Sequence, residues 1–343
     1  MNNNIKLKLK GIFFSLLLRF ISSNLRLYKI FIFFEITVVL NYPIFPTILT
    51  LSIPISEDDT NSKSRVENNY VRWLQSSGAD LISVHPWTKN EDIDSLLKKV
   101  NGVLLQGNPH KLDVQSNYYK KAKYIYEKVI KMNDSGTKMP IIILGDDMPL
   151  ICSIISEDNL SINTELKYPI YEPSKINLFN APDKTIILNE FEKEDMNALE
   201  KEYILPNNLY RIVSVKKFLS DFHFSQKFNV IATSKTKNGK EYVSIAEGKK
   251  YPIIMISFHP EYIVFEKNQD FIIPETLHSI YTSRFIGNSF VFYGRKNVMN
   301  TFTVEEKEKY GYIDPYGAFP ELIDGRYNYI FTKWKNKIYY EFI

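Results

Sequence analysis

Residues 140–144 read PIIIL, and the turn Gly145-Asp146-Asp147 follows them directly. An unbroken apolar run of this length, rich in β-branched residues, is typical of a strand buried on both faces, as in parallel sheets. The preceding segment, 116–132, contains YYKKAKYIYEKVI, in which apolar side chains recur at helical spacing. A long helix leading into a buried strand predicts a strand–helix–strand organisation around residue 140.

The same alternation extends upstream. Strand-like segments lie at 46–53 (PTILTLSI), 80–84 and 102–105, and helical patterns lie between them at 61–77 and 91–99. Strands alternating with helices predict an α/β domain with a doubly wound, mostly parallel sheet. Ligands of such folds bind at the carboxyl ends of the strands.

Downstream of residue 160 the pattern favours strands, and Asn238-Gly239 is a hairpin signal between two of them. No repeat or long linker divides residues 43–300, so we expect one domain there, with a Tyr-rich C-terminal extension, 301–343, packed on it. The expected strands are 176–179, 185–188, 211–218, 229–234, 241–246 and 252–258, and a helix is expected at 276–296 with Ile280, Phe285, Phe290 and Phe292 in the core.

Charge and composition exclude several classes of protein. The chain has 343 residues, of which 44% are hydrophobic and 24% charged, which is a globular balance. Its net charge is +4, but residues 1–42 contribute +5, so the remainder is −1. A near-neutral body gives no basis for nucleic-acid binding. The single cysteine, Cys152, cannot form an internal disulfide.

The basic N-terminal segment resembles a targeting signal. Lys6, Lys8 and Lys10 precede the apolar run 11–18 (GIFFSLLL), as in a secretory signal or signal anchor. We therefore expect residues 1–42 to direct the chain into the secretory pathway, to a secreted or lysosome/vacuole-like location, and to be its one membrane contact. Two alternatives stay open, a start codon assigned too far upstream of a soluble protein and a true membrane helix.

Three stretches carry a resemblance to a known family. They read YVRWLQSSGADLISV at 70–84, NGVLLQGNPHKL at 101–112, and NVIATSKTKNGKEYVSIAEGKKYPIIMISFHPE at 229–261. In order and spacing they resemble the gamma-glutamyl hydrolase family of the class I glutamine amidotransferase-like superfamily. The resemblance implies a flavodoxin-like three-layer sandwich and removal of gamma-linked glutamates from folate polyglutamates, with no cofactor.

The resemblance also implies a site. Its members use a cysteine on a sharp strand-to-helix turn, a histidine, and a glutamate two residues later. His259 and Glu261 match the histidine and the glutamate, as base and orienter. The thiolate attacks the amide carbonyl while the histidine takes and returns the proton. Gly107-Asn108 stands where a Gly-Gly loop binds substrate and its backbone N–H groups stabilise the oxyanion.

The nucleophile is where this chain departs from the family. Two alignments stay open, one placing Asp147 and the other Gly145 at the cysteine position, and neither supplies a thiol. Cys152 lies among apolar residues and is interpreted as a buried structural thiol. Attack by Asp147 would form an anhydride, which is a poor route to amide hydrolysis. The second histidine of the family is also missing near Asn208-Leu209-Tyr210.

These departures favour a pseudoenzyme that binds a gamma-glutamyl or folate-like small molecule, with a homodimer among the expected assemblies. One alternative is an active gamma-glutamyl hydrolase with an unrecognised nucleophile. Another is a non-catalytic interaction module that uses the aromatic tail. No metal is expected, because the nearest set, His85, His110 and Asp146, matches no metal-binding spacing.

Overall fold

The structure is a computed structural model that describes residues 45–56, 63–179, 185–266 and 271–297, together with 302–303, 306, 313, 321–323, 326–334 and 337–340. The expected signal segment, 1–42, lies outside these residues. No helix within the described ranges has the length and apolar character needed to span a bilayer.

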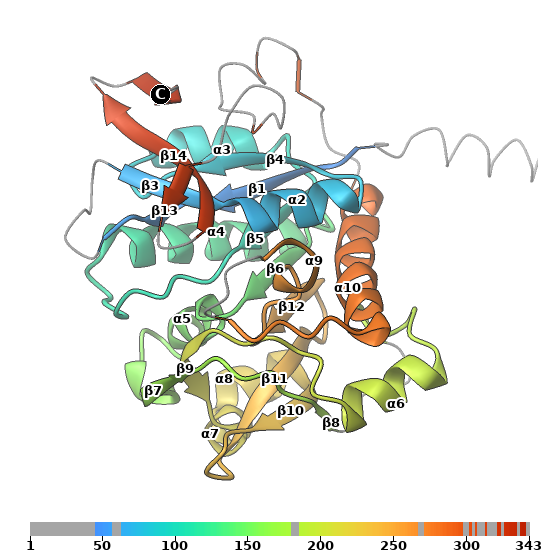
Figure 1. Cartoon of the computed structure of the whole chain (residues 1–343). Coiled ribbons are helices and arrows are strands. Elements are labelled where there is room, and N and C mark those ends of the chain that lie inside the picture. The colour runs from blue at the N-terminus through green and yellow to red at the C-terminus, as the bar shows by residue number, and fades with distance from the viewer. Residues whose placement is uncertain are drawn as a thin grey trace, which may run out of the picture. The chain divides into compact units, whose positions relative to one another are not determined.

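An eight-stranded sheet forms the centre of the molecule (Figure 1), in the order β4-β1-β5-β6-β12-β11-β10-β8. From β4 to β12 neighbouring strands are parallel, and from β12 to β8 they are antiparallel. The fold is thus an α/β sandwich with a mostly parallel centre, as predicted. The strands are β1 (Thr47–Leu51), β4 (Asp80–Val84), β5 (Gly102–Leu105), β6 (Ile141–Leu144), β8 (Asn177–Leu178), β10 (Phe228–Lys235), β11 (Glu241–Gly248) and β12 (Ile253–Ile256).

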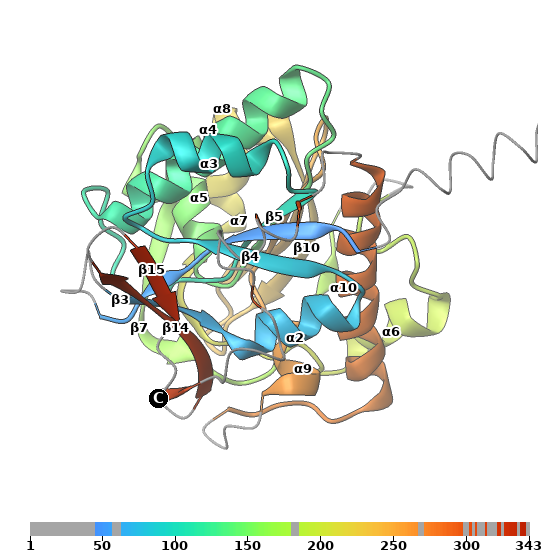
Figure 2. The ribbon, with the colours of Figure 1, turned by 90° about the horizontal axis from the view of Figure 1, so that it is seen from above.

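Helices cover both faces of this sheet (Figure 2). On one face lie α3, α4 and α5, and on the other α2 and α10. The helices are α2 (Asn68–Ser76), α3 (Asn90–Leu97), α4 (Asn117–Asp134), α5 (Asp147–Ile155), α6 (Lys193–Lys201), α7 (Val215–Ser220), α8 (Phe222–Lys227), α9 (Tyr262–Phe265) and α10 (Leu277–Lys296), with a 3-10 turn at Leu160–Ile162.

The PIIIL run explains why the core has two halves. Successive residues of a strand point to opposite faces of a sheet. Ile141 and Ile143 pack in the cluster under α3, α4 and α5, whereas Ile142 and Leu144 pack in the cluster under α2 and α10. All four side chains are fully buried. A continuous apolar run is therefore what a central parallel strand requires.

A second sheet joins the two ends of the described chain. Its strands are β2 (Ile53–Pro54), β3 (Lys63–Glu67), β13 (Glu321–Ile323), β14 (Arg326–Trp334) and β15 (Lys337–Tyr340). The C-terminal strand β14 pairs antiparallel with β3, with Tyr329 opposite Val66. A small third sheet pairs β7 (Asn163–Ile170) with β9 (Leu209–Val213).

Four sequence-based predictions are wrong in detail. The first part of the helix expected at 61–77 is β3, and α2 begins at Asn68. Residues 185–188 form no strand, because the Glu247 carboxylate binds the N–H groups of Ile186 and Ile187 in an irregular loop.

The other two concern helices. The strand expected at 211–218 ends at Val213, since Val215 and Phe218, at helical spacing, are buried on α7. On α10, Phe290 is buried as expected, whereas Phe292 is half exposed and Ile280 is also exposed. Residues two positions apart lie on nearly opposite sides of an α-helix, so Phe292 cannot enter the core together with Phe290.

Candidate active site

Gly145 forms a sharp turn between β6 and α5. Its φ is +53°, in the left-handed region that glycine enters without steric cost, and its N–H donates to Ile256 O over 2.9 Å. A Cβ placed on Gly145 would lie 2.6 Å from Nε2 and 2.5 Å from Cε1 of His259, closer than real Cβ atoms approach. The imidazole therefore occupies space that any side chain at position 145 would need.

His259 and Glu261 come together at the carboxyl end of β12. His259 Nδ1 lies 2.8 Å from Glu261 Oε1 and 3.2 Å from the Tyr70 hydroxyl. A carboxylate only accepts, so Nδ1–H donates to Glu261, and the neutral ring then carries its lone pair on Nε2. Nε2 is buried and has no hydrogen-bond partner among the described residues. The ring is oriented as a base would be, with its basic nitrogen against the Gly145 turn.

Asp147 begins α5, but its carboxylate contacts the Gly107-Asn108 loop and not His259. Oδ2 accepts from Gly107 N–H at 3.1 Å and from the Tyr118 hydroxyl at 2.6 Å, and Oδ1 accepts from Asn108 N–H at 3.3 Å. Burial raises the pKa of this carboxyl, and the three hydrogen bonds oppose that rise. The carboxylate thus occupies the backbone donors that the resemblance assigns to a substrate oxyanion.

Asp146 and Arg211 fasten the same loop to β9. The Asp146 carboxylate accepts from the N–H groups of Tyr210 and Arg211 at 3.0 and 2.9 Å. The Arg211 guanidinium lies 3.4 Å from that carboxylate and donates 2.8 Å hydrogen bonds to the carbonyls of Asn108 and His110. Burial raises the pKa of Asp146 to about 6, even though Arg211 acts to lower it. The turn and the loop are therefore held rigidly by buried charged groups.

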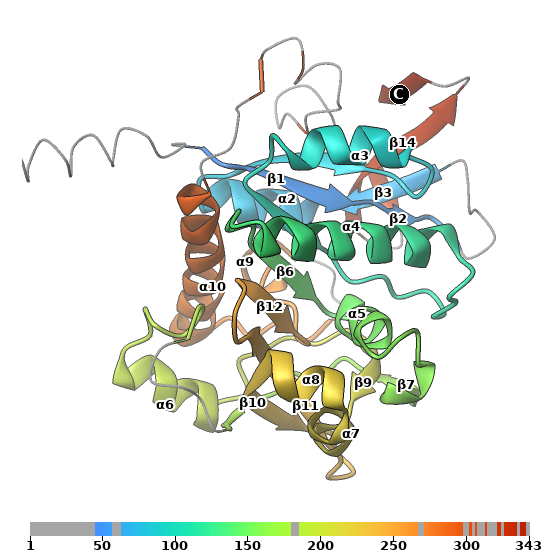
Figure 3. The same cartoon turned by 180° about the vertical axis from the view of Figure 1, so that it is seen from behind.

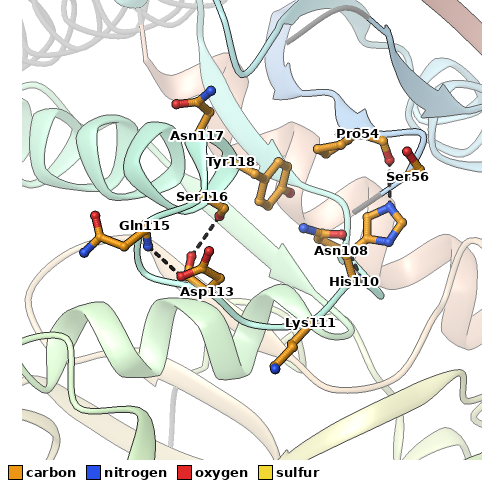
Figure 4. A pocket seen from close by; sticks show the side chains of 10 residues that line it. All are labelled: Pro54, Ser56, Asn108, His110, Lys111, Asp113, Gln115, Ser116, Asn117 and Tyr118. Atoms are coloured by element: carbon orange, nitrogen blue, oxygen red, sulfur yellow. Dashed lines mark hydrogen bonds between the residues drawn. The ribbon is translucent and has the colours of Figure 1, made fainter. Parts of the chain in front are cut away.

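A cavity of about 380 Å³ opens on the outer side of the Gly107-Asn108 loop (Figure 4). Asn108 and Tyr118 form part of its wall, and the Tyr118 hydroxyl connects it to Asp147. His110 and Lys111 lie on the same loop, and His110 Nε2 is 2.8 Å from Pro54 O. Of the residues that the structure describes, its lining includes neither His259 nor Gly145.

Cys152 is not part of this arrangement. It lies five residues after the start of α5, which at 1.5 Å per residue is about 7–8 Å along the helix axis. Its side chain is fully buried in the cluster beneath α4, where burial raises the pKa of the thiol. A buried thiol of raised pKa is a poor nucleophile.

The set His85, His110 and Asp146 is not assembled as a metal site, and among the described residues no group of three such ligands is gathered anywhere. His85 is buried between the rings of Trp87 and Phe331, and its Nδ1 lies 2.8 Å from Ser52 Oγ and 3.1 Å from Ser64 Oγ. Burial lowers the pKa of His85 to about 3. His85 directly follows β4 of the central sheet and is a neutral structural residue that packs against strands of the second sheet.

Sequence reasoning missed three side chains of the site. Tyr70 lies within one of the stretches that carry the resemblance, but a tyrosine on a helix gives no signal of contact with a histidine 189 residues later. Tyr118 looked like an ordinary residue of the apolar stripe of α4. Arg211 directly follows Asn208-Leu209-Tyr210, and only the fold shows that a buried guanidinium binds the loop.

The doubly wound sheet carries a glycine turn against a histidine–glutamate pair at the carboxyl ends of its strands, as the resemblance to the class I glutamine amidotransferase-like superfamily implies for the histidine and the glutamate. The family model for peptidase C26 matches residues 50–261, well over half of the chain. The chain therefore belongs to the peptidase C26 family.

Curated relatives carry the name of one group within this family. The chain is 27% identical to gamma-glutamyl hydrolase of Mus musculus, over 67% of this chain and 71% of that protein. It is 26% identical to gamma-glutamyl hydrolase B of Dictyostelium discoideum, over 81% and 77%. The structure of PurLQS from Thermotoga maritima is similar at a TM-score of 0.43 and 15% identity, covering 73% of this chain and 99% of that one.

Proposed function

We propose that this chain is a non-hydrolytic member of the gamma-glutamyl hydrolase group, with Gly145 at the position of the nucleophile. One observation carries the proposal. At the left-handed turn of Gly145, a side chain would point at Nε2 of His259, which has no hydrogen-bond partner among the described residues, and a nucleophilic thiol has to point at its base in the same way.

The other candidate nucleophiles lack the required geometry. Hydrolysis of a gamma-glutamyl amide by this route needs a thiolate that adds to the carbonyl carbon and a base that passes its proton to the leaving amine. Cys152 is fully buried and lies five residues after Asp147, which is about one and a half helical turns along α5 from the Gly145 turn. Asp147 has both carboxylate oxygens engaged by Gly107, Asn108 and Tyr118.

Asp147 supplies a second, independent obstacle to catalysis. An oxyanion is stabilised by backbone N–H groups that are free to receive it when the tetrahedral intermediate forms. Here the N–H groups of Gly107 and Asn108 already donate to a carboxylate of the same chain. A carboxylate at this place also repels the negative charge of an oxyanion. We therefore propose that two catalytic features are lost, the nucleophilic thiol and the free backbone N–H groups that would stabilise the oxyanion.

The ligand that we propose is a gamma-glutamyl or folate-like small molecule, bound in the cavity beside Asn108 (Figure 4). The amide groups of Asn108 and Asn117 and the cation of Lys111 line this cavity, and such groups suit the carboxylates and amides of a gamma-glutamyl chain.

The proposed location of the protein is the secretory pathway. This proposal is supported by the basic residues ahead of the apolar run 11–18, which are Lys6, Lys8 and Lys10.

The test is a peptidase assay at high protein concentration with di- and pentaglutamyl folates. We expect no release of glutamate, while an active relative in the same assay turns over. Thiol reagents should modify Cys152 in the native chain at least a thousandfold more slowly than in denaturant. Glutamate release that scales with the amount of this chain, and is lost in His259→Asn, would contradict the proposal. Binding of the same compounds, followed by calorimetry, separates loss of catalysis from loss of the pocket.

A further inference from the structure

A second cavity, of about 590 Å³, lies at the amino end of strand β12. Its lining residues belong to α4, the end of α5, the end of α8, the start of β10 and the turn that connects β11 to β12. Figure 3 shows the ribbons of α4, α5 and α8. Ile253, at the start of β12, is part of its wall, whereas His259 follows the other end of the same strand. This cavity is therefore separate from the candidate active site.

The floor of this cavity is apolar. Tyr126, Ile154, Ile155, Phe228 and Ile253 line it, and each of these side chains is more than nine-tenths buried. Pockets of 300–1,000 Å³ with an apolar floor and a few polar groups are typical of sites for small organic molecules. The floor would release water on binding an apolar body, which favours association by about 25 cal/mol per Å² of apolar surface buried.

The rim of this cavity is cationic. Lys131, Lys227, Lys249 and Lys250 line it together with only two acidic residues, Glu127 and Asp134. Asp134 is already engaged, because it lies 3.5 Å from Lys250 Nζ and accepts a hydrogen bond from Tyr251.

The lysines of the rim differ in how they are engaged. Lys249 Nζ donates to Ser225 O at 2.7 Å. Within the described part of the chain, no acidic group lies within 4 Å of the ammonium of Lys131 or Lys227. Two exposed cations are left beside an apolar floor.

We infer that this cavity, which we call the lysine-rimmed pocket, binds a single amphiphilic organic anion. The ligand class is a carboxylate or sulfonate carried on an aliphatic or aromatic body, as in a free fatty carboxylate. Lys131 and Lys227 would hold the anionic head, and the apolar body would cover Phe228 and the two isoleucines of α5. Inorganic anions lack the body that fills the floor, and neutral apolar molecules lack the charge that the rim selects.

Two fluorescent probes that differ mainly in one sulfonate test this inference on the full chain. 1-Anilinonaphthalene-8-sulfonate should bind at one site per chain, at least tenfold more tightly than neutral N-phenyl-1-naphthylamine, and dodecanoate should displace it. The double variant Lys131→Gln/Lys227→Gln should weaken binding of the sulfonate and of dodecanoate at least tenfold. Both lysines are exposed, so the fold should tolerate their replacement.

A matched control is Lys120→Gln/Lys193→Gln, which removes two exposed lysines distant from the pocket, one of them on the same helix α4. It should bind the probes as the unaltered chain does. Equal binding by the rim variant would overturn the inference. It would also be overturned if inorganic phosphate displaced the sulfonate as well as dodecanoate does, or if phosphatidylserine vesicles retained the chain through these lysines while dodecanoate did not bind.

Discussion

The Tyr118 hydroxyl donates a 2.6 Å hydrogen bond to Oδ2 of Asp147. Tyr118 lies in the wall of the cavity beside the Gly107-Asn108 loop, and Asp147 starts the helix after the Gly145 turn. One buried contact thus joins the cavity to the carboxylate that occupies the loop donors. Two of the predictions below replace a partner of this contact.

Replacing two residues together should introduce peptidase activity. Gly145→Cys supplies a thiol next to His259 once the imidazole has moved away from the introduced Cβ, and Asp147→Gly frees the N–H groups of Gly107 and Asn108. The single variant Gly145→Cys should be at least about 10²–10³-fold slower than the double variant, because loss of even one oxyanion donor has an effect of that size and Asp147 occupies two. Glutamate release from a diglutamyl folate measures both.

The introduced thiol gives a second measurement that does not depend on substrate binding. A thiol next to an imidazole has a lowered pKa and reacts faster with iodoacetamide near neutral pH. Adding His259→Asn to the double variant should abolish turnover and slow alkylation. A thiol at position 145 that is alkylated no faster than free cysteine, in a chain without turnover, would show that Gly145 is not the nucleophile position.

Removing either partner of the Tyr118–Asp147 contact should destabilise the fold. Tyr118→Phe removes a donor to a buried carboxylate, and Asp147→Asn replaces an acceptor of two backbone N–H groups by an amide with one oxygen. Each should lower the free energy of unfolding by about 1–3 kcal/mol. Because the residues are in contact, the double variant should lose less than the sum, as measured by urea unfolding. Strict additivity would contradict a direct interaction.

Asp146 should make the chain less stable as pH rises from about 4 to about 6. Its pKa is raised to about 6 in the folded chain, above the usual 3.9 of an unfolded aspartate, so the folded state binds the extra proton in this window. The free energy of unfolding should fall by at most about 3 kcal/mol across it. In Asp146→Asn this part of the pH dependence should be missing. An unchanged slope in urea unfolding between these pH values would refute the assignment.

His85, in contrast, should make the chain less stable as pH falls. Its pKa is lowered to about 3 in the folded chain, below the usual 6.5, so the unfolded state binds the proton as pH falls through this range. Between pH 6.5 and 3 this residue should cost about 1.4 kcal/mol of stability per pH unit. In His85→Gln the free energy of unfolding should fall less steeply with decreasing pH, by the contribution of one proton. The contributions of other titrating groups are the same in both chains and cancel in the comparison. The measurement is urea unfolding of both chains at several pH values.

Periodicity predicted the central sheet well because its strands are buried on both faces. PIIIL and PTILTLSI are apolar almost throughout, and β6 and β1 lie within those runs. The predictions failed where one segment changes its structure partway. Residues 61–77 read as one amphipathic helix, but the first part pairs with β14, whose residues are far along the chain. A local pattern carries no information about such a partner.

The candidate site was predictable in part. His259 and Glu261 were identified by resemblance, and they lie 2.8 Å apart. The sequence left Asp147 and Gly145 as alternatives, because both fit the spacing around the turn. Distinguishing them requires the φ of Gly145 and the direction of the Asp147 carboxylate, which follow from the loop, helix and strand that meet there. The buried contacts of Arg211 arise from three separate segments and have no sequence motif.

The pairing of β14 with β3 bears on how the protein is made. The ribosome releases β3 long before β14, so during this part of synthesis β3 and the ring of His85 lack the partner that Phe331 and its strand provide. Domains with such distant pairings complete folding slowly and expose strand edges meanwhile. A nascent chain should thus stay sensitive to proteases, and a binding target for chaperones, until β14 has emerged.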